Sequence, residues 1–186
     1  MIHYSKVITG PADLPVTIEE IRAHLNIDGT DHDTLLTQKA TAATGLCERY
    51  AGLSFVTQTR RVTLSTFTCK DVILPYGPVQ EISSFIYVDA DGNEQPVAED
   101  TYTLDLNSDL AKVRVTESWP TTNRVLNNVV IEYETGQDVA DVPIEAKEAV
   151  LRLTARLYEK RGDSSEGVMT EEVTDLLDMI KVYWYA

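Results

Sequence analysis

The stretch DHDTLLTQKATAATGLCERYAG occupies residues 31–52 and carries the pattern from which the fold follows. Its acidic cluster, Asp31 to Asp33, can cap free backbone N–H groups and suits the positive end of a helix dipole, so a helix is expected to begin there. The helix should run to about Tyr50, because Gly52 is well placed as the residue just past its end. Its apolar stripe is so broad that we expect contacts on two sides. The stripe consists of Leu35, Leu36, Ala40, Ala43, Leu46, Cys47 and Tyr50.

A shorter helix is predicted upstream of this stretch. The sequence Thr17-Ile18-Glu19-Glu20 has the spacing of a capping box, in which the threonine hydroxyl and the Glu20 carboxylate satisfy each other's backbone N–H groups. Ile18, Ile21 and Leu25 follow at helical spacing. The pattern stops at Asn26–Gly29, where glycine permits the left-handed turn. A short amphipathic helix is therefore expected here.

From Phe55 to Gly136 the apolar period changes from 3.6 to about 2, which is typical of short antiparallel strands. The expected strands are 56–64, 72–74, 82–88, 102–106, 112–115 and 128–134. Two hairpin turns are expected, one at Asp89–Asn93, where Gly92 supplies the unusual dihedral, and one at Asn107–Asp109.

Helical periodicity returns after Val142-Pro143. A proline is compatible with a helix start at this point, because in the first helical turn its missing N–H group costs no hydrogen bond. This helix is expected over Ile144–Lys160. A polar row runs along it at intervals of four residues: Glu148, Arg152, Arg156 and Lys160. Residues 162–167 are then expected to form a flexible linker. A last helix should begin at Thr170 and continue to Trp184-Tyr185, with apolar positions at Val173, Leu176, Leu177, Ile180 and Tyr183.

These elements predict an α+β fold, in which helices from both ends of the chain form one core and a small antiparallel β lobe is inserted between them. We assign residues 1–54 and 137–161 to the helical core and residues 55–136 to the β lobe. Residues 162–186 are assigned to a flexible linker and a C-terminal docking helix.

Composition excludes several classes of protein. The chain has 186 residues, with 16 Lys and Arg against 30 Asp and Glu, a net charge of −14. Nucleic-acid affinity depends on cations that replace counterions at phosphates, so autonomous DNA binding is not expected. Cys47 and Cys69 lack metal or disulfide spacing and suggest a reducing cytosol. Residues 1–15 contain no apolar stretch of the kind found in a secretory leader, and no apolar run approaches the roughly 20 residues of a membrane span, so we expect a soluble protein.

Motifs for catalysis are not found. The sequence has no phosphate-loop, dinucleotide, nucleophile-elbow or zincin signature. Its histidines are His3, His24 and His32, and a histidine triad or a His/Cys metal site would need most of them to converge with Cys47 or Cys69. We therefore predict neither catalytic nor cofactor-binding residues. The best metal candidates are Asp28, Asp31, His32 and Asp33, which lack calcium-loop spacing and are better explained as a helix N-terminus. Asp89, Asp91, Asn93 and Glu94 are likewise explained by a turn.

Two features favour an interaction protein. The row Glu148, Arg152, Arg156 and Lys160 is either a solvated helix face or one side of a subunit interface that meets acidic residues of a neighbour. The C-terminal helix is too short to be stable alone, so it is expected to dock either on its own domain or in a partner groove.

The order and spacing of these features resemble the head-tail connector (adaptor) proteins of long-tailed bacteriophages and gene-transfer particles. The resemblance covers roughly residues 15–161 and does not depend on any single motif. In the first half it is carried by Pro15-Val16-Thr17, Glu20, His24, Leu25, Ile27, Asp28, Asp33, Leu35-Leu36, the helix 40–50 and Thr57-Gln58-Thr59. Further on it is carried by Leu74-Pro75, Pro78, Ile82, Ser84, Tyr87, Asp89, Gly92, Tyr102, Asp105, Trp119-Pro120, Val129, Ile131, Tyr133, Gly136, Val142-Pro143, Ala146-Lys147 and residues 157–161.

The resemblance implies a non-enzymatic virion protein without cofactors, assembled in the bacterial cytoplasm and located at the head-tail interface. It implies a homo-oligomeric ring of about 12 copies that binds below the portal protein, extends the DNA channel and carries stopper or tail-completion proteins. DNA would pass through without specific binding. In the family the helical part builds the ring and the C-terminal segment reaches toward the portal. By that analogy the portal-docking residues are Leu176, Leu177, Ile180, Tyr183 and Trp184.

Three other functions are left open by the sequence. The nearest is another neck component, a stopper or tail-completion protein, which would need mostly β structure. A metal-dependent hydrolase using Asp28, Asp31 and Asp33 and a monomeric intracellular ligand-binding protein are the others. A stoichiometric divalent ion that is lost with Asp31→Ala would favour the hydrolase.

Overall fold

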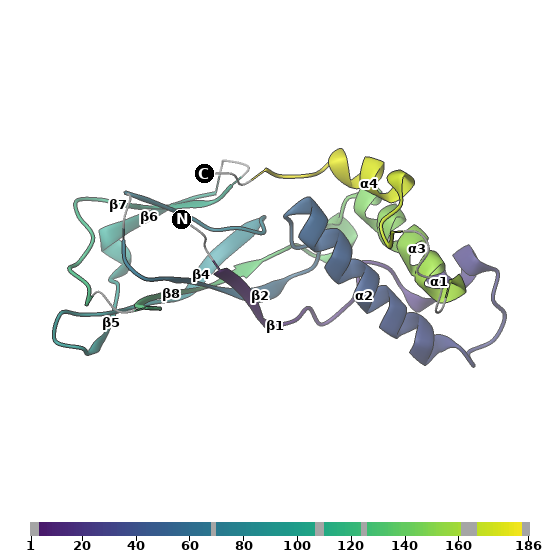
Figure 1. Cartoon of the computed structure of the whole chain (residues 1–186), viewed down its shortest axis with the longest axis horizontal. Coiled ribbons are helices and arrows are strands. Elements are labelled where there is room, and N and C mark those ends of the chain that lie inside the picture. Colours follow the sequence, from purple (N-terminus) through teal and green to yellow (C-terminus); the bar gives the residue numbers. More distant parts are fainter. Residues whose placement is uncertain (1–3, 68–69, 107–109, 124–125, 161–166, 184–186) are drawn as a thin grey trace. The chain divides into compact units, whose positions relative to one another are not determined.

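The computed structural model describes residues 4–67, 70–106, 110–123, 126–160 and 167–183. The chain divides into two compact units (Figure 1). The helical unit comprises residues 12–56 and 137–183, and the β unit comprises residues 57–136 together with the chain up to Pro11. The expected α+β fold is confirmed.

Helix α1, Ile18–Leu25, begins with the predicted capping box. The Glu20 N–H donates to Thr17 Oγ1 at 3.2 Å, and the Thr17 N–H donates to Glu20 Oε2 at 2.7 Å. The helix ends one residue after Leu25, because Asn26 takes the left-handed conformation with φ of 51°. Asparagine tolerates this conformation better than most residues, so the helix can end at Asn26, before Gly29 is reached.

Helix α2 spans Asp33–Ala51, and Gly52 ends it with φ of +71° as predicted. The helix starts within the expected Asp31–Asp33 cluster, but its capping differs from expectation. His32 is the N-cap residue and caps no N–H group with its side chain. The Asp33 carboxylate instead lies 3.6 Å from Arg22 Nε of α1. An arginine is a stronger partner for a carboxylate than a backbone N–H, and this contact holds α1 beside α2.

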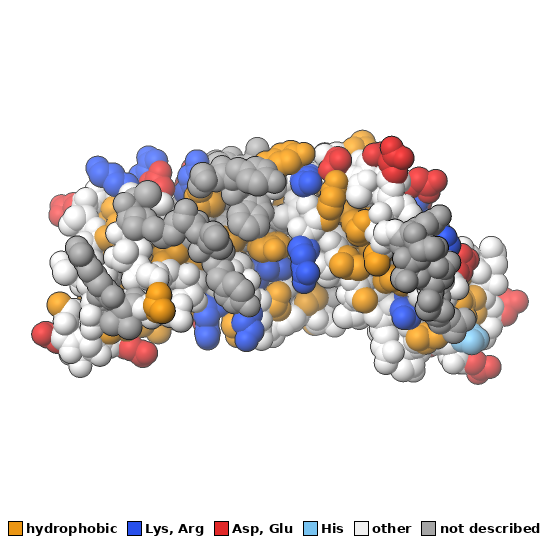
Figure 2. All heavy atoms as spheres, viewed as in Figure 1, with side chains coloured by type: hydrophobic (Ala, Val, Ile, Leu, Met, Phe, Trp, Pro, Cys, Tyr) orange, Lys and Arg blue, Asp and Glu red, His pale blue; other side chains and the backbone are white. Residues whose placement is uncertain are grey.

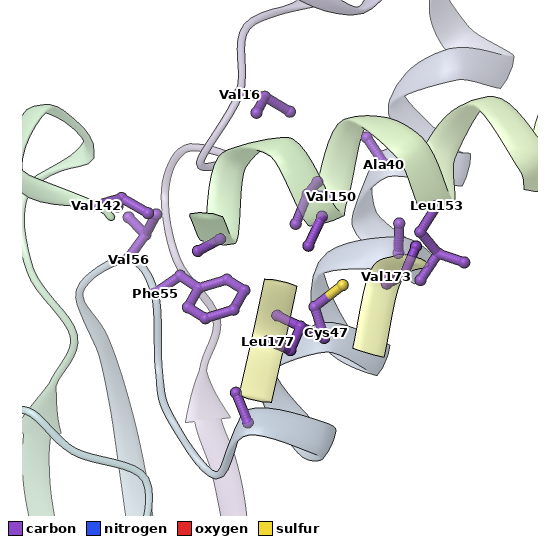
Figure 3. Close-up of a cluster of buried hydrophobic side chains, with 14 of the residues drawn as sticks. Val16, Ala40, Cys47, Phe55, Val56, Val142, Val150, Leu153, Val173 and Leu177 are labelled. Atoms are coloured by element: carbon purple, nitrogen blue, oxygen red, sulfur yellow. The ribbon is translucent and has the colours of Figure 1, made fainter. Parts of the chain in front are cut away.

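Helices α3, Ile144–Glu159, and α4, Glu171–Asp178, complete the helical unit. Buried side chains from all four helices and from the turns between them form one core (Figure 3). This core contains Val16, Ile21, Leu36, Ala40, Ala43, Cys47, Ala51, Phe55, Val56, Val142, Ala146, Ala149, Val150, Leu153, Val173 and Leu177. The buried Glu48 carboxylate accepts a hydrogen bond from the Phe55 N–H at 2.8 Å and so fixes the turn that leaves α2.

The β unit contains two antiparallel sheets. The five-stranded sheet has the order β1-β2-β8-β4-β5, and the three-stranded sheet has the order β3-β7-β6. The strands are β1 (Tyr4–Thr9), β2 (Gln58–Leu64), β3 (Asp71–Ile73), β4 (Val79–Val88), β5 (Glu94–Pro96), β6 (Tyr102–Asp105), β7 (Lys112–Val115) and β8 (Val129–Thr135). Their buried side chains form a second core, and alternate burial along β2 and β8 confirms the period of two that the sequence shows.

A buried tyrosine fixes one turn of the β unit. The Tyr133 hydroxyl donates to the Pro75 carbonyl oxygen at 2.6 Å, and burial raises the pKa of Tyr133 to about 12. The Thr135 hydroxyl donates to the carbonyl oxygens of Tyr76 and Pro78, the latter at 2.9 Å. The Arg60 guanidinium lies 3.7 Å from the centre of the Tyr76 ring. Side chains of β2 and β8 therefore hold the segment that leads into β4.

The structure adds to or corrects the expectations for three segments, and a fourth lies outside the described residues. Residues 4–9 were assigned to the helical core, but they form β1, which pairs with β2 in the register Lys6↔Arg61. The hairpin at Asp89–Asn93 is confirmed, with Gly92 at φ of 90°, and β5 is its second strand. The turn expected at Asn107–Asp109 lies outside the described residues. Helix α4 ends at Asp178 rather than near Trp184, because the chain turns at Met179 to contact α2.

The thiol of Cys47 provides a test of the helical core. Cys47 is fully buried, and burial raises its pKa to about 12, with Glu48 adding to the effect. The thiolate is disfavoured only in the folded state, so the folded protein keeps the Cys47 thiol protonated at a pH where the unfolded chain loses this proton. The stability of the protein is therefore unaffected by the ionisation of Cys47 below the unfolded pKa of about 8.5 and decreases as the pH rises from there toward 12.

We expect a Cys69→Ser variant to react with a thiol reagent only after unfolding in urea. Between pH 7 and pH 10 it should lose about 1–2 kcal/mol more stability than a variant that also carries Cys47→Ala. Rapid labelling of the native protein would show that Cys47 is accessible and would contradict this core.

Candidate interaction surfaces

The acidic clusters considered as metal sites are occupied by protein contacts. Asp33 faces Arg22, and the His32 ring packs edge-on against Tyr158 with 5.8 Å between ring centres. The Asp89 carboxylate accepts from the N–H groups of Asp91 at 3.0 Å and Asn93 at 2.9 Å. These bonds, led by the one from Asn93, hold the pKa of Asp89 below its usual value. Among the described residues, no group of three or more His, Cys, Asp or Glu could hold a metal ion.

None of the helices in the described ranges combines the length and apolar character that a membrane span requires.

Two arginines of the β unit form cross-strand ion pairs on its surface. Arg61 of β2 pairs with Glu132 of β8. Arg114 of β7 donates two hydrogen bonds of 2.7 Å to Asp71 of β3, and these bonds hold the pKa of the Asp71 carboxyl below its usual value. Exposed pairs of this kind contribute little to stability, but they fix strand register and leave these arginines less available to a partner.

The polar row on α3 ties that helix to α4. Arg152 Nε lies 2.7 Å from Glu148 Oε1, and its Nη1 lies 3.4 Å from Glu172 Oε2 of α4. The hydrogen bond with Glu148 raises the pKa of Arg152. Arg156 donates to the Gly167 carbonyl oxygen at 3.0 Å, while Lys160 is exposed at the end of the helix. Much of the row is therefore engaged within the chain, and its role in a ring interface stays a prediction.

Helix α4 docks on its own unit, one of the two alternatives that the sequence left open. Thr170 occupies the N-cap position, and Glu171 and Glu172 lie in the first turn. Val173 and Leu177 are buried in the helical core, with exposed fractions of 1% and 0%. Figure 3 shows both side chains in the core, with Leu177 beside Cys47 of α2 and Val173 beside Leu153 of α3.

The segment after α4 is fastened to the end of α2. The Val182 N–H donates to the Ala51 carbonyl oxygen at 3.0 Å, and the Tyr50 hydroxyl donates to Asp178 Oδ1 at 3.0 Å. The bond to Asp178 raises the pKa of Tyr50. Lys181 Nζ lies 3.9 Å from the centre of the Tyr50 ring. Polar contacts at several points therefore hold this segment down as far as Val182.

The residues predicted to dock on a portal lie in very different surroundings. Leu177 is buried, and Leu176 and Ile180 are half-buried against the same core. The side chain of Leu177 is thus not available while α4 is docked. Tyr183 is 60% exposed, and Trp184 lies outside the described residues.

Met179, which is 72% exposed, was missed by the sequence reasoning. The signal was that it follows Glu171 and Asp175 at intervals of four residues, on the polar side of the helix.

Comparison with known proteins agrees with the resemblance predicted from the sequence. Residues 15–84 match the family model of the phage gp6-like head-tail connector protein. This part of the chain runs from the approach to α1 into β4, so it includes elements of both units. No curated protein matches the sequence.

The whole chain also has the fold of solved neck proteins. It matches a chain from the neck of an empty gene transfer agent particle, solved with C6 symmetry, at 21% identity and a TM-score of 0.83, over 98% of this chain and 97% of that one. A chain from the virion of a native gene transfer agent matches at 22% identity and a TM-score of 0.80, over 98% and 97%. A chain from the neck of a native gene transfer agent particle, solved with C12 symmetry, matches at 22% identity and a TM-score of 0.77, over 100% of this chain and 98% of that one. At these identities the likeness establishes the fold.

Proposed function

We propose that this chain is a structural protein of a phage or gene-transfer-agent neck, a head-tail connector that assembles into a closed ring around the DNA channel. The observation that carries the proposal is the agreement of two independent comparisons. The family match covers residues 15–84, and the fold match extends over almost the whole chain to proteins of virion necks. The location that follows is the head-tail interface of the virion.

The arrangement of the molecule supports a scaffold rather than a catalyst. The acidic clusters form a turn at Asp89 and an ion pair between Asp33 and Arg22, and Arg152 of α3 pairs with Glu172 of α4. A connector needs stable surfaces for neighbours, and both units provide these on well-packed cores. We therefore propose that the protein works by binding and positioning other proteins, without chemistry of its own.

Charge supports a channel that DNA passes without being held. Each copy carries a net charge of −14, so a ring of about a dozen copies holds on the order of 170 negative charges. A wall of like charge does not bind phosphates. The same repulsion opposes ring closure, so we propose that the ring forms on a portal template rather than spontaneously.

The contact with the portal belongs to this proposal as well. The family resemblance assigns it to the C-terminal segment, where Tyr183 is 60% exposed. Leu177 contributes by anchoring α4 in its own core, from which the chain continues toward the partner.

Native mass spectrometry of the purified protein, alone and mixed with portal rings of the same particle, tests the proposal. We expect monomers or small oligomers alone and a complex of about a dozen copies on each portal ring. Electron microscopy of that complex should show a closed ring. Unchanged monomers in the presence of portal rings would reject the connector function.

A further inference from the structure

We propose that the outer face of α2 in one copy receives the outer face of α4 in the next copy, and that this contact closes the ring. The inference rests on the ring of the proposed function and names the surfaces that form it. Two different surfaces of the same chain would meet, as the heterologous contacts of a cyclic assembly require.

The outer face of α2 is a stripe of solvent-facing residues opposite the buried side of the helix. The residues recur at alternating intervals of three and four, the spacing that brings side chains onto one helix face. They are Leu35, Gln38, Ala42, Gly45 and Arg49. Leu35 is half-buried and the others are exposed. This stripe carries no acidic residue, although the chain has almost twice as many acidic as basic side chains.

Gly45 in the middle of this stripe faces open space. A Cβ at this position would meet nothing within 4 Å, and its φ is not in the left-handed region. Glycine in a helix interior makes the helix less stable than alanine would, and no contact of Gly45 among the described residues offsets this loss. Next to Ala42 it leaves a shallow place where another helix can approach the backbone closely.

Two threonines beside the stripe use their hydroxyl groups within the helix. The Thr37 hydroxyl donates to the Asp33 carbonyl oxygen at 2.9 Å, and the Thr41 hydroxyl donates to the Thr37 carbonyl oxygen at 2.8 Å. Both hydroxyl hydrogens are therefore satisfied inside the helix. A partner can cover these side chains without leaving a buried donor unpaired.

Charge complementarity points to α4 as the occupant. Arg49 and Lys39 of α2 form no ion pair or hydrogen bond within the described part of the chain, and the same is true of the Glu171 and Asp175 carboxylates of α4. All four charges of α4 are acidic and exposed, and Figure 2 shows acidic side chains gathered where α4 lies. Opposite potentials of this kind steer two surfaces together and fix their register.

Shape agrees with charge on the outer face of α4. Met179 is 72% exposed and follows Asp175 by one helical turn, so an apolar side chain projects beside the carboxylate. We place Met179 over Ala42 and Gly45 of the neighbouring copy and Asp175 at its Arg49. Within one copy α4 contacts α2 through Asp178 and Tyr50, whereas Asp175 and Met179 of the outer face of α4 are exposed.

Charge reversal at the two faces tests the pairing. In native mass spectrometry with portal rings, Arg49→Glu and Asp175→Arg should each lower the ring population about tenfold, and the double variant should restore it. Lys6→Glu on β1 reverses an exposed charge on neither face and serves as the matched control. Equal ring formation by wild type and both single variants would overturn the inference, and so would single variants that the double variant does not rescue.

Gly45→Gln separates assembly from stability. We expect its melting temperature to be equal to or above that of wild type, because glutamine is the better helix former, while ring formation falls. A lower melting temperature would show that Gly45 serves its own chain and would overturn the inference. If wild type forms rings that Gly45→Gln and Arg49→Glu also form, the connector function stands without this interface. If wild type forms no ring on the portal, the proposed function itself fails.

Discussion

A Leu177→Ala variant is expected to lose about 2–5 kcal/mol of unfolding free energy, the range for removal of a fully buried leucine side chain. Leu177 lies in the core of the helical unit, where α4 meets α2 and α3. An eight-residue helix has little stability of its own, so α4 depends on such packing to remain folded. Urea denaturation followed by far-ultraviolet circular dichroism measures the loss.

Leu176→Ala provides the matched control, since the same side chain is removed one residue earlier, at a half-buried position. Its cost should be clearly smaller than that of Leu177→Ala. If Leu177 were instead a docking residue for a portal, its removal would leave the stability of the isolated protein unchanged and weaken only the complex. That result would mean that α4 is not packed as the structure shows.

The helical boundaries at α1 and α2 could be predicted because their signals are local. The capping box at Thr17 and the glycine at position 52 act on backbone groups within a few residues, and both are confirmed. The strands β2 and β8 were also predicted, since alternate burial leaves a period of two in the sequence.

Two features depended on partners distant in sequence. Residues 4–9 include the strand-favouring residues Val7, Ile8 and Thr9, but they become β1 only by pairing with β2, which lies far along the chain. The apolar spacing after Thr170 continues to Tyr183, yet α4 stops at Asp178, where the chain turns to bond Ala51 and Tyr50. No local preference encodes either contact.

The candidate site could be predicted only in part for the same reason. The sequence indicated that α2 is apolar on two sides and that α4 must dock. It could not tell which apolar residues of α4 face inward. Burial assigns Leu177 to the core and leaves Met179, the residue that caps the end of α4, outside it.

The β unit has an aromatic cluster of its own. A Phe85→Ala variant is expected to lower the unfolding free energy of this unit by about 3–5 kcal/mol. Phe85 is buried between Tyr102, with 5.3 Å between ring centres, and Trp119, at 5.9 Å. Phe67 stacks on Trp119 at 4.4 Å. Removing the central ring leaves the other aromatic side chains without their common neighbour, so the loss should exceed that of an aliphatic truncation at the surface.

Ile86→Ala on the same strand is the control, because its side chain points to the other face of the sheet and is half-buried. Native-state hydrogen exchange should show lost protection in β4, β6 and β8 for Phe85→Ala, whereas Leu177→Ala should lose protection in α2, α3 and α4. This separation is expected because each unit packs its own residues into its own core. Equal costs for Phe85→Ala and Ile86→Ala would contradict the aromatic core, since only Phe85 is buried against the rings of Tyr102 and Trp119.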